Sequence, residues 1–283
     1  MDQPNCLLCG AVASGRPWFI KTTAGTEYPI VRCAACKSAF VWPRPESQVI
    51  SALYTSQVVQ PNEKADGIYL PSAETDARRL FRRFSSSIAQ GSLLDIGAGE
   101  GVASAEAVRR GFTVRACEPS PQGARLFAQR LGFEPDRTFF DVDYAEKNRG
   151  NFDVALLSHV LEHTPDPNSF VQNICTVLKP GGSVIVAVPL FGSILTSFMG
   201  KKDFFVTPPV HLTYFSLAGL AGLLNRNGFE VVASYTSSKV NMERYKTTLG
   251  PMRYAVNITG YLVLRASEMF HRSVVLNVCA KRT

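Results

Sequence analysis

The sequence predicts an α/β protein in which a mostly parallel sheet is covered by helices on both faces. Two observations along the 283 residues support this prediction: short apolar runs recur, and a helical pattern separates most of them. Strands buried on both faces consist of continuous apolar runs, and parallel neighbours need a crossover, usually a helix. A cysteine-rich segment precedes this alternation and, at roughly 45 residues, is too short to bury much core of its own.

Composition and charge exclude several classes of protein. Hydrophobic residues make up 46% and charged residues 19% of the chain, which is ordinary for a globular protein and excludes a disordered or collagen-like one. The apolar stretch 183–198 is broken by Pro189 and Gly192, so we expect no membrane span. The first ten residues have no basic lead and no apolar run, so we expect a cytoplasmic location. The formal charge of +7 favours anionic ligands and is too diffuse to require nucleic acid.

Four of the seven cysteines form two Cys-x-x-Cys pairs near the N-terminus. They are Cys6, Cys9, Cys33 and Cys36. A two-residue gap lets two thiolates of one turn reach a tetrahedral ion, and two such turns complete a closed shell of four ligands. We therefore expect residues 1–45 to form a zinc ribbon around a structural ion, with short strands near residues 18–20 and 28–31. Two disulfides and an iron–sulfur cluster are the alternatives.

Residues 46–283 are expected to form the α/β domain, which begins with a mainly helical segment over residues 46–90. The expected strands are apolar runs between turn-forming residues, at 92–96, 112–117, 137–140, 152–157, 183–188, 229–234 and 274–279. The expected helices lie between them, at 102–110, 121–131, 168–178 and 216–227. Gly228 follows the last of these helices, as glycine commonly does at a helix C-terminus.

The loop after the first expected strand is the clearest sign of a ligand site. It belongs to the segment LLDIGAGEG at 93–101, and such a glycine loop lets a ligand approach the backbone at the carboxyl end of the sheet. A dinucleotide fingerprint needs a third glycine where Val102 stands, and Asp95 and Glu100 would repel a pyrophosphate. Acidic side chains favour a cationic ligand instead. Glu118 ends the next strand, where a carboxylate can accept hydrogen bonds from both ribose hydroxyls.

With its later motifs, the chain resembles the class I S-adenosylmethionine-dependent methyltransferases. The shared motifs follow one another along residues 68–283 and read LLDIGAGEG (93–101), ACEPS (116–120), FDVALLSHVLEH (152–163) and LKPGGSVIVAVP (178–189). HLTYFS (211–216) and LLNRNGFEVV (223–232) resemble the closing elements of the family. The resemblance implies a Rossmann-like, seven-stranded sheet of order 3-2-1-4-5-7-6, with the last strand antiparallel.

The same resemblance implies a set of residues that bind S-adenosylmethionine. By position they are Tyr69, Asp95, Gly97, Gly99, Glu118, Pro119, Asp141, Ser158 and His159. In the family pattern Asp95 would orient the ammonium group, directly or through water, and Glu118 would hold the ribose. Asp141 would bind the adenine amine, with Asp143 as the competing residue.

The activated methyl group needs only an aligned acceptor and removal of the acceptor's proton. His163 is the first candidate for the general base, because a free imidazole titrates near neutrality, and Glu162 precedes it in the Glu-His stretch. His211 is the second candidate, and the alternative is that His163 only orders its loop. Insertions at 190–210 and 236–273 are expected to roof the acceptor pocket, or else to extend the core or make a dimer contact.

The expected function is S-adenosylmethionine-dependent methyl transfer to an oxygen or carbon of a small, anionic molecule. A zinc ribbon joined to such a domain resembles bacterial methyltransferases of nucleotide-linked sugars and related metabolites. The first alternative is an RNA methyltransferase whose zinc module reads the substrate, although Ser158 and His159 stand where base-amine methyltransferases have Asn/Asp-Pro-Pro-Tyr. The second alternative is a non-catalytic, cofactor-binding scaffold whose ribbon recruits protein partners.

Overall fold

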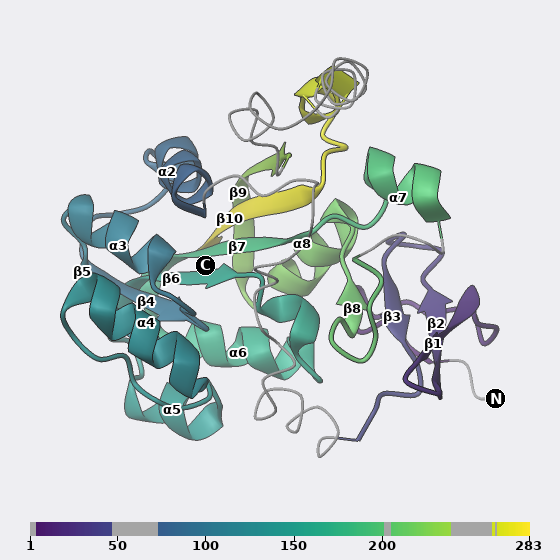
Figure 1. Ribbon diagram of the computed structural model, residues 1–283, viewed down its shortest axis with the longest axis horizontal. Helices are drawn as coiled ribbons and strands as arrows, with labels where there is room; N and C mark the ends of the chain where they lie inside the picture. The colour runs from purple at the N-terminus through teal and green to yellow at the C-terminus, as the bar shows by residue number, and fades with distance from the viewer. Residues whose placement is uncertain (1–3, 47–72, 201–204, 239–261, 264) are drawn as a thin grey trace, which may run out of the picture.

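The computed structural model describes residues 4–46, 73–200, 205–238, 262–263 and 265–283, and a six-stranded sheet lies at its centre (Figure 1). Its strands are β4 (Ser92–Ile96), β5 (Thr113–Cys117), β6 (Phe152–Ser158), β7 (Leu178–Pro189), β9 (Phe229–Ser237) and β10 (Val275–Arg282). They lie in the order β5-β4-β6-β7-β10-β9; β10 is antiparallel to both its neighbours, whereas the β4, β5, β6 and β7 pairings are parallel. In the numbering of the expected sheet this order is 2-1-4-5-7-6.

The third expected strand, at residues 137–140, is the one that the structure does not contain. Asp136 makes a single parallel bridge to Cys117. The carbonyl of Asp136 accepts the amide of Glu118 at 3.0 Å and also the amide of Thr138 at 2.9 Å. The second bond closes a tight turn, so the chain leaves the sheet after one paired residue.

Helices cover both faces of the sheet. They are α2 (Ala73–Phe84), α3 (Val102–Arg109), α4 (Pro121–Leu131), α5 (Val142–Lys147), α6 (Pro167–Val177), α7 (Ile194–Met199) and α8 (Leu217–Arg226). Leu94 belongs to a core cluster that includes Val171 of α6 and Leu224 of α8, with α5 beside them. Leu93, the preceding residue of β4, belongs to a second cluster with Phe81 of α2, which α3 completes. Neighbouring residues of one strand thus point into different helical layers, as expected for a sheet covered on both sides.

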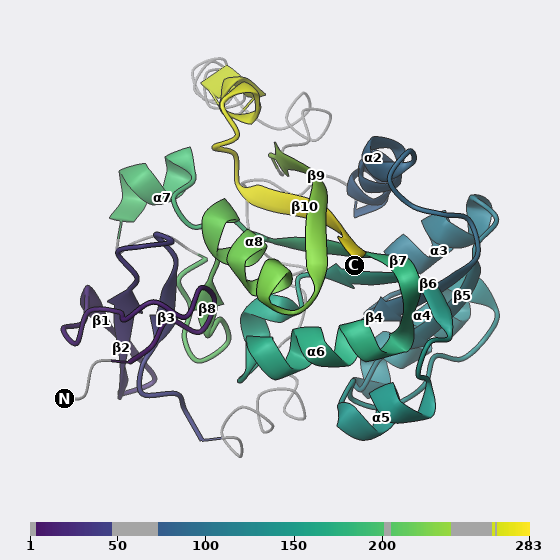
Figure 2. The same cartoon turned by 180° about the vertical axis from the view of Figure 1, so that it is seen from behind.

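The N-terminal segment forms a second, smaller sheet that shares a strand with the larger domain (Figure 2). Its strands β1 (Phe19–Thr23), β2 (Thr26–Arg32) and β3 (Ala39–Val41) are antiparallel, and β8 (Thr213–Tyr214) pairs with the free edge of β3. Ser38 and Ser216 lie 2.9 Å apart through their hydroxyl oxygens and are buried. A Cβ on Gly219 would come within 2.0 Å of the Ser38 hydroxyl, so this position of α8 has no room for a side chain. Residues 4–46 are thus joined closely to the larger domain.

None of the helices in the described parts of the chain combines the length and the apolar character that a membrane span needs.

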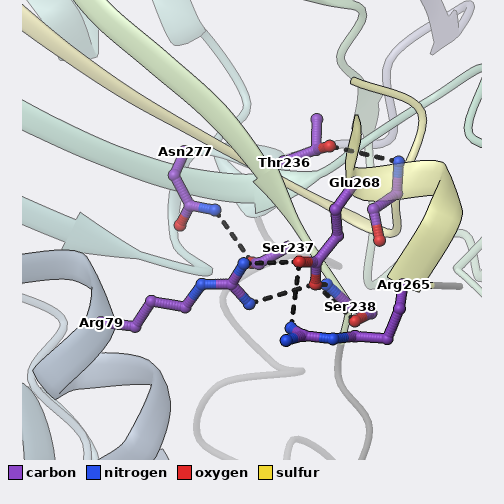
Figure 3. A network of polar contacts seen from close by, with 8 residues as sticks. Arg79, Thr236, Ser237, Ser238, Arg265, Glu268 and Asn277 are labelled. Carbon is purple, nitrogen blue, oxygen red and sulfur yellow. Dashed lines mark hydrogen bonds and ion pairs between the residues drawn. The ribbon is translucent and has the colours of Figure 1, made fainter. Parts of the chain in front are cut away.

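Glu268 connects the segment before β10 to α2 and to the end of β9 (Figure 3). Its carboxylate accepts two bonds from the Arg79 guanidinium, at 3.1 and 2.6 Å, and two from Ser238, at 2.8 Å from the amide and 2.6 Å from the hydroxyl. Arg265 adds a contact at 3.1 Å. Although burial opposes ionisation, the bonds from Arg79 and Ser238 lower the pKa of Glu268 to about 2.

Replacing Glu268 by glutamine is expected to lower the free energy of unfolding by about 2 kcal/mol near neutral pH, because charge-assisted hydrogen bonds are lost. The carboxyl has a lower pKa in the folded chain than the ordinary value of 4.5. Its contribution is therefore present above that value and is lost as the pH falls toward 2. Urea unfolding at neutral pH and near pH 3 measures both effects. Glu74→Gln, at an exposed pair with Arg78, is the control and should cost less than about 1 kcal/mol. An equal loss for Glu268→Gln at both pH values would contradict this assignment.

Candidate active site

The glycine loop between β4 and α3 has one side that is open. Gly97, Gly99 and Gly101 all adopt positive φ, at 68°, 53° and 72°, a region that glycine enters without steric cost. A Cβ on Gly97 would lie 2.7 Å from a methyl of Val160, and one on Gly101 would lie 2.6 Å from the Phe127 ring. A Cβ on Gly99 would meet nothing within 4 Å. Gly97 and Gly101 therefore serve close packing, whereas the backbone at Gly99 faces space that a ligand can enter.

Glu118 is buried directly beside this loop. Its side-chain oxygens accept the amide of Gly99 at 2.7 Å and the amide of Ser120 at 2.8 Å. Burial raises the pKa of Glu118, and these two amide bonds act against that shift. Each carboxylate oxygen can accept more than one bond, so Glu118 can also accept ribose hydroxyls while it holds the loop.

Asp95 is buried more deeply, with 2% of its surface exposed. Its carboxylate accepts the Ser104 hydroxyl of α3 at 2.7 Å, and burial raises its pKa to about 6. The sequence analysis did not single out Ser104, because a hydroxyl on a helix gives no signal of its partner.

The other expected cofactor residues in the described parts of the chain are more exposed than Asp95 and Glu118. Asp141 is exposed and caps the N-terminus of α5, and Asp143 is exposed in the first turn of that helix. Pro119 is half-buried after β5, and Ser158 is exposed at the end of β6. Tyr69 lies outside the described residues.

The three residues that the sequence indicated for catalysis lie together. Glu162 and His163 belong to the 3₁₀ turn η1 (Leu161–His163) that follows β6, and His211 precedes β8. One potential ligand atom from each lies within 4.8 Å of the others, and the two imidazole ring centres are 4.9 Å apart. Glu162 Oε1 is 4.0 Å from His163 Nε2 and 3.2 Å from Nδ1 of His159, which was expected near the cofactor. Val160, which packs on Gly97, connects this cluster to the glycine loop.

Backbone carbonyls fix the tautomers of both histidines. Nδ1 of His163 lies 2.8 Å from the Val210 carbonyl, and Nδ1 of His211 lies 2.6 Å from the Phe205 carbonyl. A carbonyl only accepts, so each Nδ1 carries hydrogen and each Nε2 carries the lone pair of the neutral ring. Burial lowers the pKa of His211, which favours this neutral form.

Glu162 is an ionised group at the centre of this cluster. It is 1% exposed. Burial opposes its ionisation, but the hydrogen bond with His159 and the nearby imidazoles of His163 and His211 lower its pKa to about 2. The cluster therefore places a buried carboxylate beside two imidazole nitrogens that can take up a proton.

A pocket lies beside His211. The pocket is small: its walls include Phe191, Thr196, Phe205 and Tyr214, and the space between them has room for about one water molecule. Several of these residues belong to the expected insertion at 190–210, which therefore does line a pocket. Most of the second expected insertion, 236–273, lies outside the described residues.

The N-terminal module lies behind this pocket. Phe191 packs edge-on against Trp18, with ring centres 5.5 Å apart. Phe191 and Tyr214 share a buried apolar cluster with Phe19 and Ile30 of the module. The small sheet thus supports the wall of the pocket.

The four N-terminal cysteines form a compact thiol cluster. Their Sγ atoms lie within 4.8 Å of one another, with 3.6 Å between Cys6 and Cys36 and 3.7 Å between Cys9 and Cys33. Metal–sulfur bonds of 2.3 Å in a tetrahedron separate the sulfurs by about 3.8 Å, whereas a disulfide requires about 2.05 Å. The contact with the Cys6 sulfur and the bond from the backbone amide of Ser38 outweigh burial and lower the pKa of Cys36 to about 4. The donors fit a tetrahedral zinc ion.

Fold and site together define a class I S-adenosylmethionine-dependent methyltransferase, in agreement with the motifs of the sequence. The six-stranded sheet with antiparallel β10, the open glycine loop and the acidic residue after β5 are its marks. The chain belongs to the methyltransferase domain family, which matches residues 69–234.

Curated relatives match a shorter part of the chain. A ubiquinone biosynthesis O-methyltransferase of Xanthomonas euvesicatoria is 33% identical over 104 residues, which are 35% of this chain and 44% of that protein. An enzyme of the same name from Escherichia coli O139:H28 is 37% identical over 97 residues, 32% of this chain and 40% of its own. The chain thus spans less than half the length of these relatives.

Solved structures show the same fold at low sequence identity. A SAM-dependent methyltransferase from Archaeoglobus fulgidus gives a TM-score of 0.55 at 15% identity, over 74% of this chain and 95% of its own. The 1,6-didemethyltoxoflavin-N1-methyltransferase of Burkholderia thailandensis, with bound S-adenosylhomocysteine, gives 0.53 at 18% identity, over 95% and 100%. The Rossmann-like methyltransferase fold predicted from the sequence is confirmed, apart from its third strand.

Proposed function

We propose that this protein transfers the methyl group of S-adenosylmethionine to a hydroxyl oxygen of a small molecule. The observation that carries the proposal is the position of the cluster formed by Glu162, His163 and His211. It packs on the glycine loop on one side through Val160, and it borders the aromatic pocket on the other through His211. The relatives named O-methyltransferases support oxygen as the acceptor atom.

In this proposal each part of the site has one task. Gly99 and Glu118 hold the nucleoside, and the pocket aligns the acceptor with the methyl group. The acceptor oxygen attacks the methyl carbon, the carbon–sulfur bond breaks, and S-adenosylhomocysteine leaves. The hydroxyl proton passes to Nε2 of His163, whose ring is oriented by the Val210 carbonyl, and Glu162 stabilises the resulting imidazolium.

The class of acceptor follows from the relatives and from the pocket walls. The names of the relatives refer to ubiquinone biosynthesis, and the side chains of Phe191, Phe205 and Tyr214 favour an aromatic acceptor. Phenolic hydroxyls are therefore the first class to test, and the nucleotide-linked sugar expected from the sequence is the second. The formal charge of +7 supports an anionic acceptor of either class.

The N-terminal cysteines are proposed to hold a structural zinc ion, supported by the spacing of their sulfur atoms. Such a site needs reduced thiols, which supports the expected cytoplasmic location. A homodimer, formed through the insertions at 190–210 and 236–273, stays a prediction.

Formation of S-adenosylhomocysteine with a panel of small phenols and nucleotide-linked sugars tests the function. Methylated product from a phenol supports the proposal. Binding of S-adenosylmethionine without turnover on any acceptor favours the scaffold alternative. Turnover on RNA alone would instead favour the alternative that the protein is an RNA methyltransferase.

Glu118→Ala is expected to weaken S-adenosylmethionine binding by about 1.5–3 kcal/mol, the scale of hydrogen bonds to a charged group. The change removes the acceptor for the ribose hydroxyls and releases the amide of Gly99. Calorimetric titration measures the affinity, and Glu134→Ala, at an exposed pair with Arg137, is the matched control. An unchanged affinity in Glu118→Ala would remove this residue from the cofactor site.

A further inference from the structure

Glu162, His163 and His211 have the composition of a metal site. Besides the four cysteines they are the other group of potential metal ligands in the described ranges, and one donor atom from each lies within 4.8 Å of the others. Bonds of 2.1 Å in a tetrahedron would place these atoms about 3.4 Å apart. An ion would therefore need to draw each pair together by about 1.4 Å at most, which small side-chain rotations can supply.

Glu162 has an unsatisfied atom at this place. Its Oε1 contacts His159, but its Oε2 is buried and has no hydrogen-bond partner. A buried carboxylate oxygen without a donor is costly, and such atoms are rare in folded proteins. The contacts of Glu162 with His159 and His163 are made by Oε1, so these side chains leave Oε2 unsatisfied, and a cation bound by the carboxylate would compensate its charge.

The surroundings of the two histidines match those of metal ligands. Ligating histidines almost always donate their second ring N–H to a backbone carbonyl or a carboxylate. Here Nδ1 of His163 is held by the Val210 carbonyl and Nδ1 of His211 by the Phe205 carbonyl. Both Nε2 atoms therefore carry the lone pair that a metal ligand needs. His159 in turn holds Oε1 of Glu162, as hydrogen-bonded partners of ligating carboxylates do.

We propose that Glu162, His163 and His211 bind a divalent transition-metal ion. Two imidazoles and one carboxylate suit Mn²⁺, Fe²⁺ or Zn²⁺ better than Mg²⁺ or Ca²⁺, which prefer oxygen ligands. Three protein ligands leave coordination positions for substrate, unlike the closed shell of four cysteines. Because His211 lines the small pocket, these positions lie beside the space where we propose that the acceptor binds.

The consequence for catalysis rests on the proposed function, whereas the binding of the ion does not. An ion at this place acts as a Lewis acid on the acceptor oxygen and lowers the pKa of the hydroxyl, so that its proton leaves to water. In the loaded protein the two Nε2 atoms are ligands. The ion then takes over the activation of the hydroxyl that His163 performs without it.

Titration with Mn²⁺ of full-length protein that carries one equivalent of zinc, enough for the four cysteines alone, tests the site. The zinc-preferring thiolates keep their zinc, so the loss of the free Mn²⁺ signal in electron paramagnetic resonance reports the second site alone. We expect about one equivalent to bind, and binding at least about 10-fold weaker in Glu162→Gln. Glutamine keeps the shape of the buried side chain, and circular dichroism verifies that this variant folds. His271→Ala, a histidine outside the cluster, is expected to bind Mn²⁺ like the unaltered protein.

Zinc content after dialysis provides a second measurement, with about two equivalents expected in the unaltered protein and about one in Glu162→Gln. A protein that holds one equivalent of zinc and no Mn²⁺ overturns the site, as does equal Mn²⁺ binding in Glu162→Gln. Methyl transfer without any such binding would overturn the site and leave the proposed function intact. Mn²⁺ binding that depends on Glu162, with no methyl transfer to any acceptor, supports the site and refutes the function.

Discussion

Replacing His163 by alanine is expected to lower methyl-transfer turnover by about 10²–10⁴-fold. The variant loses Nε2, the atom that takes the proton of the acceptor hydroxyl or, with an ion bound, one of its three ligands. The affinity for S-adenosylmethionine should hardly change, because in the proposed site Gly99 and Glu118 hold the nucleoside on the other side of Val160. Single-turnover rates and calorimetric titration measure the two quantities separately.

A structural role for His163 predicts a different pattern. If the imidazole only orders the loop through the Val210 carbonyl, exogenous imidazole will not restore turnover in His163→Ala. If its nitrogen acts in the reaction, imidazole that enters the vacated space should restore part of the rate. His271→Ala is the control for the loss of a histidine elsewhere. Near-normal turnover of His163→Ala would shift the test to His211→Ala.

The strands of the large sheet could be predicted from the sequence because they are continuous apolar runs separated mainly by helical segments. Their order came from the family resemblance. The one strand that was wrong, at 137–140, is short and lies at the edge. It does not form because the turn in which the amide of Thr138 donates to the Asp136 carbonyl takes the chain out of the sheet after one paired residue. Three-residue turns with a backbone hydrogen bond of this kind are common at strand ends, and a pattern of apolar residues does not predict them.

The members of the proposed catalytic cluster could be predicted from the sequence, but their arrangement could not. Glu162 and His163 stood out because they follow the fourth strand of a recognisable motif, and His211 because it begins another. Their approach to one another depends on how the segment before β8 folds back over η1, where Leu212 donates to the Glu162 carbonyl at 2.8 Å. The unsatisfied Oε2 of Glu162 and the carbonyl that fixes His211 are products of that folding. No residue pattern in the sequence predicts them.

The predicted division of the chain at residue 45 also rested on local sequence features alone. The two Cys-x-x-Cys pairs indicated a module, but nothing in its composition showed that β8 would extend its sheet. Arg44 adds to this connection with bonds to the Leu212 carbonyl at 2.5 Å and to the Thr213 hydroxyl at 2.6 Å. The last cysteine pair, β3 and the wall of the pocket are therefore mechanically linked.

Cys33→Ser is expected to lose the zinc ion of the cysteine site and to unfold much of residues 4–46. Zinc-finger peptides gain about 10–16 kcal/mol from binding the metal, so the loss of one of four thiolates removes most of what holds a module this small. Elemental analysis measures the zinc, and hydrogen exchange locates the unfolding. Exchange should rise over β1, β2, β3 and β8, whereas β4, β6 and β7 stay protected by their own core. Cys175→Ser, at a half-buried cysteine outside the cluster, should keep the zinc.

The same variant tests whether the module supports the acceptor pocket. Trp18 packs on Phe191, and Tyr214 of β8 lines the pocket, so unfolding of the module removes one wall. The glycine loop and Glu118 lie in the large sheet and its connections, so cofactor binding should survive. We therefore expect the KM for the acceptor to rise at least about 10-fold, with little change in the Kd for S-adenosylmethionine.

Unchanged zinc content, or an iron–sulfur absorption band in the purified protein, would contradict the assignment of the metal. If a variant that has lost this zinc ion keeps an unaltered acceptor KM, the pocket does not depend on the module. The wall formed by Phe191 and Tyr214 would then keep its structure when the module is unfolded.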